Sequence, residues 1–328
     1  MKGRENMQTT NQTTKKTNEQ TNRNNTLQDI TSAAPKDITS AATHTTTSAA
    51  MQDTTSAVSQ TQHTFVIPAY LESPHLDACL WSLKQQTHQS NIVIVTSTPN
   101  SHIDKMADKY KVPVIVNPIR GSIATDWNFA LEQGGEGLVT LAHQDDVYTD
   151  RYVESCVKAY EKNDDVTIIF TDYSEIIGSG GVIRGNTLLL FVKRLLLFPY
   201  QIKSVIRSRF IKRGVLQMGS PICCPSVCLN KSRLPDFQFS HDYTVNMDWD
   251  AWLRIAEIPG AMIYIPERFC LHRIHSGSET SKGIYENRRR EEDLRIFKKI
   301  WPKPIAYAIS KVYAFSYTSN QCIQDTKE

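Results

Sequence analysis

The first 62 residues of this 328-residue chain contain no aromatic side chain and no cysteine, although they include 16 threonines. Their only branched aliphatic residues are Leu27, Ile30, Ile38 and Val58. So little apolar surface cannot offset the conformational entropy lost on folding, which excludes a stable core in this part. We predict a disordered tail over residues 1–62, and a folding unit from residue 63 onward that is long enough for one α/β domain.

The tail also contains an eight-residue repeat, which runs from Asp29-Ile-Thr-Ser-Ala-Ala to Asp53-Thr-Thr-Ser-Ala-Val58. A unit of eight residues is shorter than any common solenoid repeat and offers no apolar face for stacking. We favour a structureless extension, and the alternative is a polar tether or an adhesin-like spacer.

Acidic residues are absent from residues 176–235, where ten lysines and arginines occur. The net charge of the whole chain is only +3, because 29 acidic side chains outnumber 21 basic ones in the rest of the folding unit. The charge pattern predicts a basic stretch within an acidic body. Such a stretch suits an acidic acceptor or an anionic membrane surface as a partner.

Long apolar runs are missing as well. The most apolar segment, residues 187–211, is interrupted by five basic residues and a proline, so it does not meet the requirements for a membrane-spanning helix. We predict a basic amphipathic insertion over residues 176–216, which is either a helix pair lying on anionic lipid or a helical hairpin packed on the sheet. The residues between its charges are mainly leucine and isoleucine rather than stacking aromatics, which argues against nucleic acid as a partner.

No N-terminal segment has the basic-then-apolar pattern of a secretory signal, and the seven cysteines are an odd number. Both observations favour reduced thiols and a cytoplasmic location, either free or peripheral on the inner face of the membrane. Cys223, Cys224 and Cys228 lack a second ligand pair at zinc spacing, so we expect them to line a buried strand.

Strands and helices alternate along the folding unit. Apolar runs predict strands at 64–68, 92–95, 114–116, 138–141, 166–171 and 261–265. Helical spacing predicts helices that begin at Ser73-Pro74 and lie near 103–110, 124–131, 150–161, 248–257 and 285–299. This alternation indicates βαβ units and therefore an α/β fold with a Rossmann-like, mainly parallel sheet flanked by helices.

No glycine-rich phosphate loop follows the first predicted strand. The absence of both G-x-G-x-x-G and G-x-x-x-x-G-K-[ST] there argues against a dinucleotide-dependent dehydrogenase and a P-loop enzyme. The turn instead contains Pro68, Ala69, Tyr70 and Glu72. An aromatic ring and a carboxylate on a proline-fixed turn suit a nucleobase or a ribose, and a plain strand-ending turn is the alternative.

His143, Asp145 and Asp146 follow the strand predicted at 138–141. Neighbouring carboxylates repel each other unless a cation or hydrogen-bond donors compensate, and Mg²⁺ or Mn²⁺ binds few carboxylates together with substrate phosphates. Such pairs also occur as helix caps. Because ligands bind beyond the carboxyl ends of parallel strands, the position of this pair favours a metal site.

Asp248 and Asp250 lie in the first turn of the helix predicted at 248–257. The helix dipole favours the carboxylate form at that position. An ionised carboxylate can act as a general base if an acceptor hydroxyl reaches it, and the alternative is that both acids only cap the helix.

In this order, these segments resemble glycosyltransferase family 2, an inverting family with the GT-A fold, over about residues 63–280. The segment 65–70 resembles the family's opening strand and nucleotide-binding turn, and 121–130 resembles the segment that ends in Asn and begins a helix. Residues 143–146 stand where the family has its Asp-x-Asp-Asp metal motif. Residues 247–254 resemble the Glu-Asp motif with its trailing Trp-Leu-Arg, and 271–280 resemble the closing Tyr-Arg-x-His loop.

Four residues depart from the family pattern. His143 replaces the first acid of the metal motif and is either a ligand or a hydrogen-bond partner. Thr96 and Ser97 stand where the family usually has an Asp that contacts the nucleobase or ribose, and Met247 replaces the Glu of the Glu-Asp pair, which leaves Asp248 as the base.

The resemblance implies transfer of a sugar from a nucleotide-diphosphate sugar to an acceptor hydroxyl with inversion. The acceptor would be a glycan or a lipid-linked molecule in bacterial cell-surface glycan, lipopolysaccharide or capsule assembly. The implied domains are the tail, a GT-A domain over 63–280 and a C-terminal helical extension over 281–328.

The resemblance also implies roles for individual residues. A divalent cation, Mg²⁺ or Mn²⁺, would be held by Asp145, Asp146 and His143, with Asp248 as the general base. Nucleotide-binding positions would be Pro68, Ala69, Tyr70, Glu72, Thr96, Asp126, Asn128 and Asp145. His272, Arg273 and His275 would reach the phosphates from a mobile loop.

Two other functions compete with this interpretation. A nucleotidyltransferase would also use paired acids, but it would more naturally have a loop rich in glycine and lysine after the first strand. A membrane-docked scaffold that kept the GT-A fold and lost activity is favoured only by His143, Thr96 and Met247.

Overall fold

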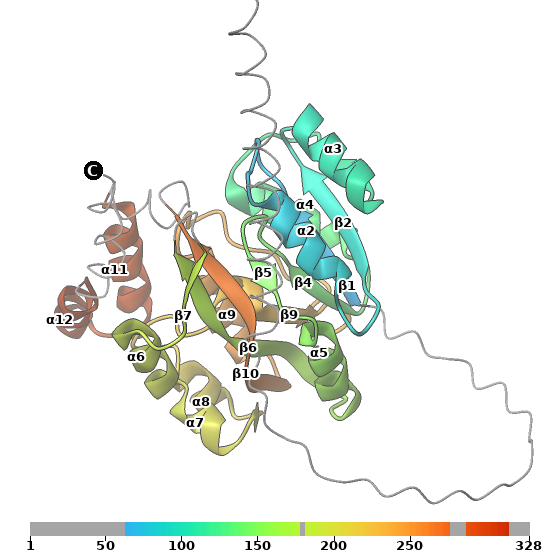
Figure 1. Ribbon diagram of the computed structural model, residues 1–328. Coiled ribbons are helices and arrows are strands. Elements are labelled where there is room, and N and C mark those ends of the chain that lie inside the picture. The colour runs from blue at the N-terminus through green and yellow to red at the C-terminus, as the bar shows by residue number, and fades with distance from the viewer. Residues whose placement is uncertain (1–62, 178–180, 276–286, 315–328) are drawn as a thin grey trace, which may run out of the picture. The chain divides into compact units, whose positions relative to one another are not determined.

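A computed structural model of the chain describes residues 63–177, 181–275 and 287–314 (Figure 1). All of these residues belong to one compact unit. The tail predicted over residues 1–62 lies outside the described residues, so its disorder stays a prediction.

Within the described residues, ten strands form a single sheet. They are β1 His63–Pro68, β2 Asn91–Thr96, β3 Val114–Val116, β4 Leu138–Leu141, β5 Val147–Tyr148, β6 Val166–Ile177, β7 Val182–Arg184, β8 Val205–Ile206, β9 Val227–Asn230 and β10 Ala261–Ile274. The order is β3-β2-β1-β4-β9-β6-β10-β5, with β7 paired to β6 and β8 paired to β10. Parallel ladders join β1 to β2 and β4, β2 to β3, and β6 to β10, whereas β5, β7, β8 and β9 pair in antiparallel fashion.

Helices cover both faces of the sheet, which confirms the predicted fold class. They are α2 Leu76–Lys84, α3 Ser101–Tyr110, α4 Ile123–Gln133, α5 Tyr152–Glu161, α6 Leu188–Leu196, α7 Phe198–Ile202, α8 Arg209–Gly214, α9 Met247–Glu257, α11 Arg288–Ile300 and α12 Lys303–Tyr313. Successive residues of a strand point to opposite faces. Phe65 and Ile67 therefore pack with α2, α3 and α5, whereas Val66 packs with α4, α9 and α11.

Strands β6 and β10 are longer than the sequence predicts. They pair in parallel from Val166 opposite Ala261 to Ile177 opposite Ile274. The second half of β6 contains acidic and hydroxyl side chains, which are typical of loops, so only its apolar first half was expected to be a strand. Pro266 is tolerated within β10 because it lies at a register shift in the ladder, where a missing N–H costs little.

Two local predictions need correction. Helix α2 begins at Leu76 rather than at the predicted Ser73-Pro74. Residues 73–75 form a turn instead, in which the Ser73 hydroxyl accepts the N–H of His75 (3.3 Å). Strand β9 was not predicted as an element. Cys228 lies on this buried strand as expected, whereas Cys223 and Cys224 are buried in the turn before it.

The C-terminal helices pack against α9. The indole of Trp249 on α9 lies 5.1 Å from the ring of Phe297 on α11 and 5.8 Å from that of Tyr313 on α12, measured between centroids. The carboxylate of Glu292 on α11 accepts three backbone N–H groups from residues 244–246, at 2.8 to 2.9 Å. Helix α11 therefore holds the beginning of α9 in place.

Among the helices of the described part of the chain, none combines the length and apolar character required to cross a bilayer.

Candidate active site

The turn after β1 and the segment after β4 are tied together at the carboxyl ends of the parallel strands. Tyr70 donates its backbone N–H to the side-chain oxygen of Gln144 (3.1 Å), and the Gln144 amide donates to the carbonyl of Tyr70 (3.1 Å). Pro68 ends β1, and the buried Ala69 donates its N–H to the carbonyl of Val95 (2.8 Å). The expected nucleotide turn therefore lies beside the expected metal motif.

His143, Asp145 and Asp146 form a cluster whose ligand atoms lie within 4.8 Å of one another. Nε2 of His143 is buried and has no hydrogen-bond partner among the described residues. Burial lowers the pKa of His143, so the ring is neutral at pH 7 and offers a lone pair. A neutral imidazole and two carboxylates are a suitable ligand set for a divalent cation.

The two carboxylates of this cluster have different surroundings. Asp146 is fully buried and accepts the backbone N–H of Arg273 (2.7 Å), and Nδ1 of His272 lies 3.1 Å from the same oxygen. Asp145 is partly exposed and accepts a hydrogen bond from Nε2 of His275 (2.8 Å). Asp146 thus fastens the segment 143–146 to strand β10. Asp145 has fewer hydrogen bonds from the protein, so its carboxylate is more available to a cation.

The histidines keep Asp145 ionised. Burial opposes ionisation of its carboxyl, but the hydrogen bond from His275 and the nearby rings of His143 and His272 outweigh this and lower its pKa to about 2. The carboxylate therefore carries its charge throughout the physiological pH range.

The residues expected in a mobile phosphate loop are placed differently. His272 and Arg273 lie on strand β10, where the ladder with β6 fixes them, and only His275 follows the strand. The guanidinium of Arg273 donates to the backbone carbonyl of Asp145 (2.9 Å), and Arg273 is 6% exposed. These side chains therefore reach the metal cluster from a rigid strand, and residues 276–280 of the expected loop lie outside the described residues.

Asp248 lies at the beginning of α9, and its carboxylate accepts the N–H of Trp249 (2.7 Å). Burial raises the pKa of Asp248, although the charges of Arg289 and Lys193 oppose the shift. A carboxylate with a raised pKa is a stronger base than a solvated one. The negative charge of Asp248 opposes the lowering of the His143 pKa, so the expected base is within electrostatic range of the His143, Asp145 and Asp146 cluster.

The other acid in this turn, Asp250, faces elsewhere. Its carboxylate pairs with Arg254 on the same helix (2.8 Å) and with Lys299 on α11 (3.2 Å). Asp250 therefore stabilises the helix packing rather than contributing to the site.

A hollow of about 550 Å³ opens at the ends of β1 and β2. It is lined by Leu71, Glu72, Thr98, Pro99, Asn100 and Arg120. Leu71 has a φ of 54°, a left-handed conformation that a branched residue rarely adopts, and the hydroxyl of Thr98 accepts its N–H (2.8 Å). Glu72, which was expected to bind the nucleotide, lines this hollow. Tyr70 is exposed and directly precedes Leu71, another lining residue.

Two other expected nucleotide residues serve the scaffold. Thr96 is 1% exposed. Asp126, on α4, accepts hydrogen bonds from the hydroxyl of Ser97 (2.9 Å) and the amide of Asn117 (3.0 Å), so both of its oxygens are engaged. Asp126 thereby joins α4 to the ends of β2 and β3.

Asn128 supports the cluster of His143, Asp145 and Asp146 indirectly. Its side-chain amide donates to the carbonyl of Phe239 (3.0 Å) and accepts the N–H of the same residue (2.7 Å). The ring of Phe239 packs edge-on against Trp127 (5.0 Å), and Trp127 packs against His143 (4.9 Å). The structure thus uses Asn128 to fix the aromatic wall of the cluster.

The model of glycosyl transferase family 2 matches residues 64–230 of the chain. The chain belongs to glycosyltransferase family 2. The match includes the turn after β1 and the metal cluster, and it ends before α9. Comparison with curated protein sequences finds no match.

Solved structures show the same fold. S. aureus TarS 1-349 in complex with UDP-GlcNAc has a TM-score of 0.52 and 14% identity, with 79% of this chain and 73% of that chain covered. The mannosyltransferase PcManGT from Pyrobaculum calidifontis, in complex with GDP-Man and Mn²⁺, has a TM-score of 0.53 and 15% identity, with 80% and 71% covered. The chain covers only 44% of the longer S. aureus TarS structure, at a TM-score of 0.50. At these identities the likeness establishes the GT-A fold and nothing finer.

One basic residue near the candidate site, Lys193, was not identified from the sequence. Lys193, on α6, donates to the hydroxyl of Tyr173 on β6 (2.7 Å), and the ring of His272 lies 6.4 Å from that of Tyr173. Lys193 is also near enough to Asp248 for its charge to act on that carboxylate. The sequence did not indicate this position, because Lys193 lies within an apolar run and only the packing of α6 shows which way its side chain points.

Arg120 is a second residue that sequence analysis missed. It lines the hollow and donates from Nε to the backbone carbonyl of Ser97 (3.2 Å). Its place just before the segment 121–130 was the signal that could have identified it.

Proposed function

We propose that this glycosyltransferase transfers a sugar from a nucleotide-diphosphate sugar to an acceptor hydroxyl with inversion of the anomeric configuration. The observation that carries the proposal is the joining of three parts of the chain at one end of the sheet. The turn that borders the hollow is hydrogen-bonded to Gln144 within the segment of His143, Asp145 and Asp146, and the charge of Asp248 acts on His143 of that cluster. The UDP-GlcNAc and GDP-Man bound to the two structural neighbours support the donor class.

In the proposed reaction, Asp248 takes the proton of the acceptor hydroxyl. The acceptor oxygen forms a bond to the anomeric carbon as the bond between that carbon and the diphosphate breaks. The nucleoside diphosphate leaves with the bonding electron pair. Attack on the face opposite the leaving group inverts the configuration, and the raised pKa of Asp248 suits a general base.

The donor set fits a divalent cation, which Asp145 and His143 would hold, with Asp146 as a further ligand or as the anchor of the motif. When bound, Mg²⁺ or Mn²⁺ would neutralise charge on the departing diphosphate. His275 keeps Asp145 ionised for this purpose, and Arg273 fixes its backbone. The Mn²⁺ bound to PcManGT supports this cofactor class.

Lys193 and Arg120 would supply further positive charge. The charge of Lys193 acts on Asp248, where the acceptor would bind, and Arg120 borders the hollow, where the nucleotide would bind. Each of these two cations could bind an anionic group of a substrate. His272 lies between Asp146 and the ring of Tyr173.

We assign the reaction to cell-surface glycan assembly, with a glycan or lipid-linked acceptor as in lipopolysaccharide or capsule synthesis. The basic stretch over residues 176–235 supports an acceptor that carries acidic groups.

The test is release of nucleoside diphosphate from a panel of UDP-, GDP- and dTDP-sugars. Asp248→Asn should abolish release because it removes the base and keeps the shape of the side chain. Asp250→Asn is the matched control in the same helical turn and should keep release. Proton NMR of the product should show the anomeric configuration opposite to that of the donor.

A separate measurement tests the cation site without turnover. Electron paramagnetic resonance of Mn²⁺ should show binding by the wild-type protein and much weaker binding by Asp145→Asn. If no donor of the panel is turned over while the protein is folded, the inactive scaffold replaces the proposed enzyme.

A further inference from the structure

Helices α6 and α7 carry a continuous stripe of exposed apolar side chains. Its members, here named the apolar stripe, are Leu188, Phe191, Leu195, Phe198 and Ile202, with exposures of 79%, 62%, 60%, 54% and 73%. Leu188, Phe191 and Leu195 recur at intervals of three and four residues, which places them on one side of α6, and Phe198 and Ile202, four residues apart, share one side of α7. Large apolar side chains scattered singly on a surface are ordinary, but a contiguous stripe of five marks an interaction site.

The opposite side of the same two helices faces the body of the protein. Leu190, Leu197 and Tyr200 are buried there, and Arg194 pairs with Asp172 on β6 (2.8 Å). Lys193 points to the same side and reaches the hydroxyl of Tyr173. The helix pair therefore turns its two basic residues inward and five apolar residues outward, which is the reverse of an ordinary surface helix.

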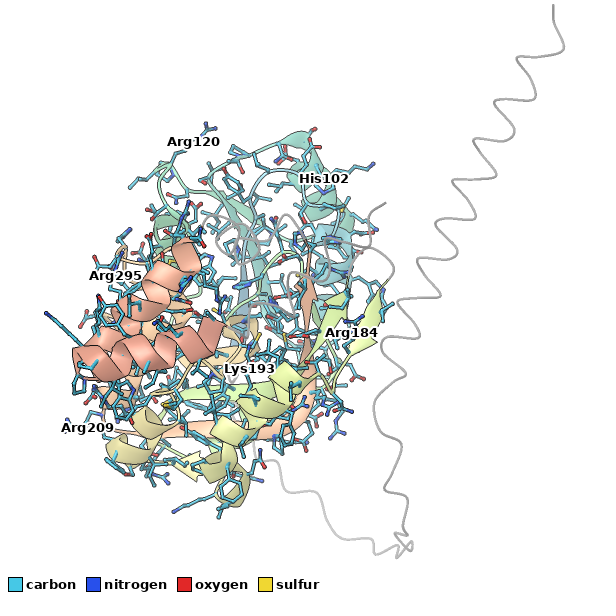
Figure 2. The ribbon with its side chains drawn as sticks, turned by 90° about the vertical axis from the view of Figure 1, so that its left-hand side faces the viewer. His102, Arg120, Arg184, Lys193, Arg209 and Arg295 are labelled. Atoms are coloured by element: carbon cyan, nitrogen blue, oxygen red, sulfur yellow. The ribbon has the colours of Figure 1, made fainter. Side chains whose placement is uncertain are left out.

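We propose that the apolar stripe docks on an anionic lipid bilayer, with the basic side chains around it at the headgroups. Exposed apolar side chains together with basic ones fit the interface of an anionic bilayer. No acidic residue occurs over 176–235, and Arg184 and Arg209 lie on either side of α6 and α7 (Figure 2). Arg207 and Arg209 pair with Asp165 and Glu257 and still expose about half or more of their side chains.

Helix α8 extends this surface with another exposed ring. Phe210 is 84% exposed and follows Arg209 directly. Lys212, on the same helix, is fully buried and donates to the carbonyls of Ile258 and Gly260, at 2.7 and 3.0 Å. Here too a basic residue points inward and an aromatic residue outward, so α8 repeats the pattern of α6.

Docking through the apolar stripe would bring the site to the bilayer surface, because α6 supplies Lys193 to it. An acceptor anchored in the bilayer could then present its hydroxyl to Asp248 without leaving the membrane. The docking surface goes beyond the proposed function, and only this last step, a lipid-linked acceptor, rests on it.

The experiment is co-sedimentation of the full chain with vesicles of phosphatidylcholine, with and without phosphatidylglycerol, at low and high salt. The wild-type protein should bind the anionic vesicles, and high salt should weaken the binding. A variant with Phe191→Gln, Leu195→Gln and Ile202→Gln should bind about ten-fold or more weakly, because it loses most of the apolar contact. Val116→Gln, an exposed apolar residue at the β3 edge of the sheet, is the matched control and should bind as the wild type does.

Circular dichroism melts and donor hydrolysis are measured on the same variants. A triple variant that melts and hydrolyses donor normally but loses vesicle binding supports the docking surface independently of the reaction. Failure of the wild type to bind anionic vesicles would overturn the proposal. So would equal binding by the triple variant, or a wild-type dimer that this variant converts to a monomer without any vesicle binding.

Discussion

Lys193 is the residue whose surroundings depart most from what its type favours. Its ammonium group donates to the hydroxyl of Tyr173 and lies over that ring, and no carboxylate of the described residues forms an ion pair with it. Burial lowers the pKa of Lys193, although Glu175 and Asp248 oppose the shift. A half-buried cation without a paired anion costs folding free energy, which is typical of a residue that is kept for a ligand.

Lys193→Met keeps the length of the side chain and removes the charge. We expect the melting temperature to stay the same or rise, because the desolvation cost disappears. Release of nucleoside diphosphate in the presence of acceptor should fall about ten-fold or more, since a bond to a charged group is worth about 1.5–3 kcal/mol. A lower melting temperature with unchanged turnover would show that Lys193 is only structural.

The same substitution should change the pH dependence of kcat/KM. In the proposed mechanism activity requires ionised Asp248, so the rate should fall as the pH drops through the pKa of this carboxyl. The Lys193 ammonium lowers that pKa, and its removal must raise it. The acid limb of the profile should therefore move to higher pH in Lys193→Met and stay in place in Lys203→Met, whose lysine is exposed at the end of α7. An unmoved acid limb in Lys193→Met would exclude the electrostatic contact.

At the scale of elements, α11 determines where α9 begins. Asn246, just before α9, donates from its side chain to Asp293 (2.7 Å), and Glu292 accepts the N–H groups of residues 244–246. The Asn246 side chain makes no capping bond to α9 itself. Two acids of another helix therefore replace a local cap, and Asp248 stands two residues beyond the point that they hold.

Glu292→Gln should weaken all three backbone bonds, because the amide oxygen is a poorer acceptor than a carboxylate and its NH₂ group repels the donors. We expect a loss of about 1–3 kcal/mol in the free energy of unfolding and a melting temperature lower by several degrees. kcat should fall more than KM changes, since the proposed base is displaced while no residue of α11 lines the hollow proposed for the nucleotide.

Glu291→Gln is the control for this variant, because Glu291 is exposed on the same turn of α11. It should change neither the melting temperature nor kcat. If Glu292→Gln lowers the melting temperature but leaves kcat intact, α11 stabilises the protein without positioning Asp248.

At the scale of the whole molecule, the sequence predicts what depends on local pattern. Apolar alternation and strand-helix order predict the parallel sheet, and β3 and β4 have the predicted bounds. Asp145, Asp146 and Asp248 were identified as site candidates because acids at strand ends and helix starts are visible in sequence. Features that depend on contacts between distant segments could not be predicted. Examples are the extension of β6 and β10 through polar residues and the inward orientation of Lys193.

The same limit explains the residues whose type suggested nucleotide contact. Asp126 and Asn128 stand in the expected segment, yet their polar atoms join neighbouring elements of the scaffold. A sequence shows that a polar side chain lies near the site, but its partner depends on which loops pack against it. This is why Arg120, just before that segment, lines the hollow without having been expected to do so.

The match to the family model ends at residue 230, but the folded unit continues beyond it with α9, β10, α11 and α12. Ile296 and Phe297 of α11 are fully buried in the core cluster that contains Trp249 and Trp252 of α9. Burial of two such side chains is worth about 3–6 kcal/mol, and the bonds of Glu292 add about 2 kcal/mol. That sum is comparable with the entire stability of a typical domain, about 5–15 kcal/mol.

A protein of residues 63–286 should therefore be insoluble or melt without cooperativity, whereas residues 63–328 should melt cooperatively, as the full chain does. The comparison requires expression of the three proteins and thermal melts followed by circular dichroism. A cooperative melt of 63–286 within a few degrees of the full chain would show that α11 and α12 form an appendage. Loss of folding in 63–286 alone would show that the catalytic unit includes the C-terminal helices, because the carboxylate proposed as its base lies on a helix that they hold in place.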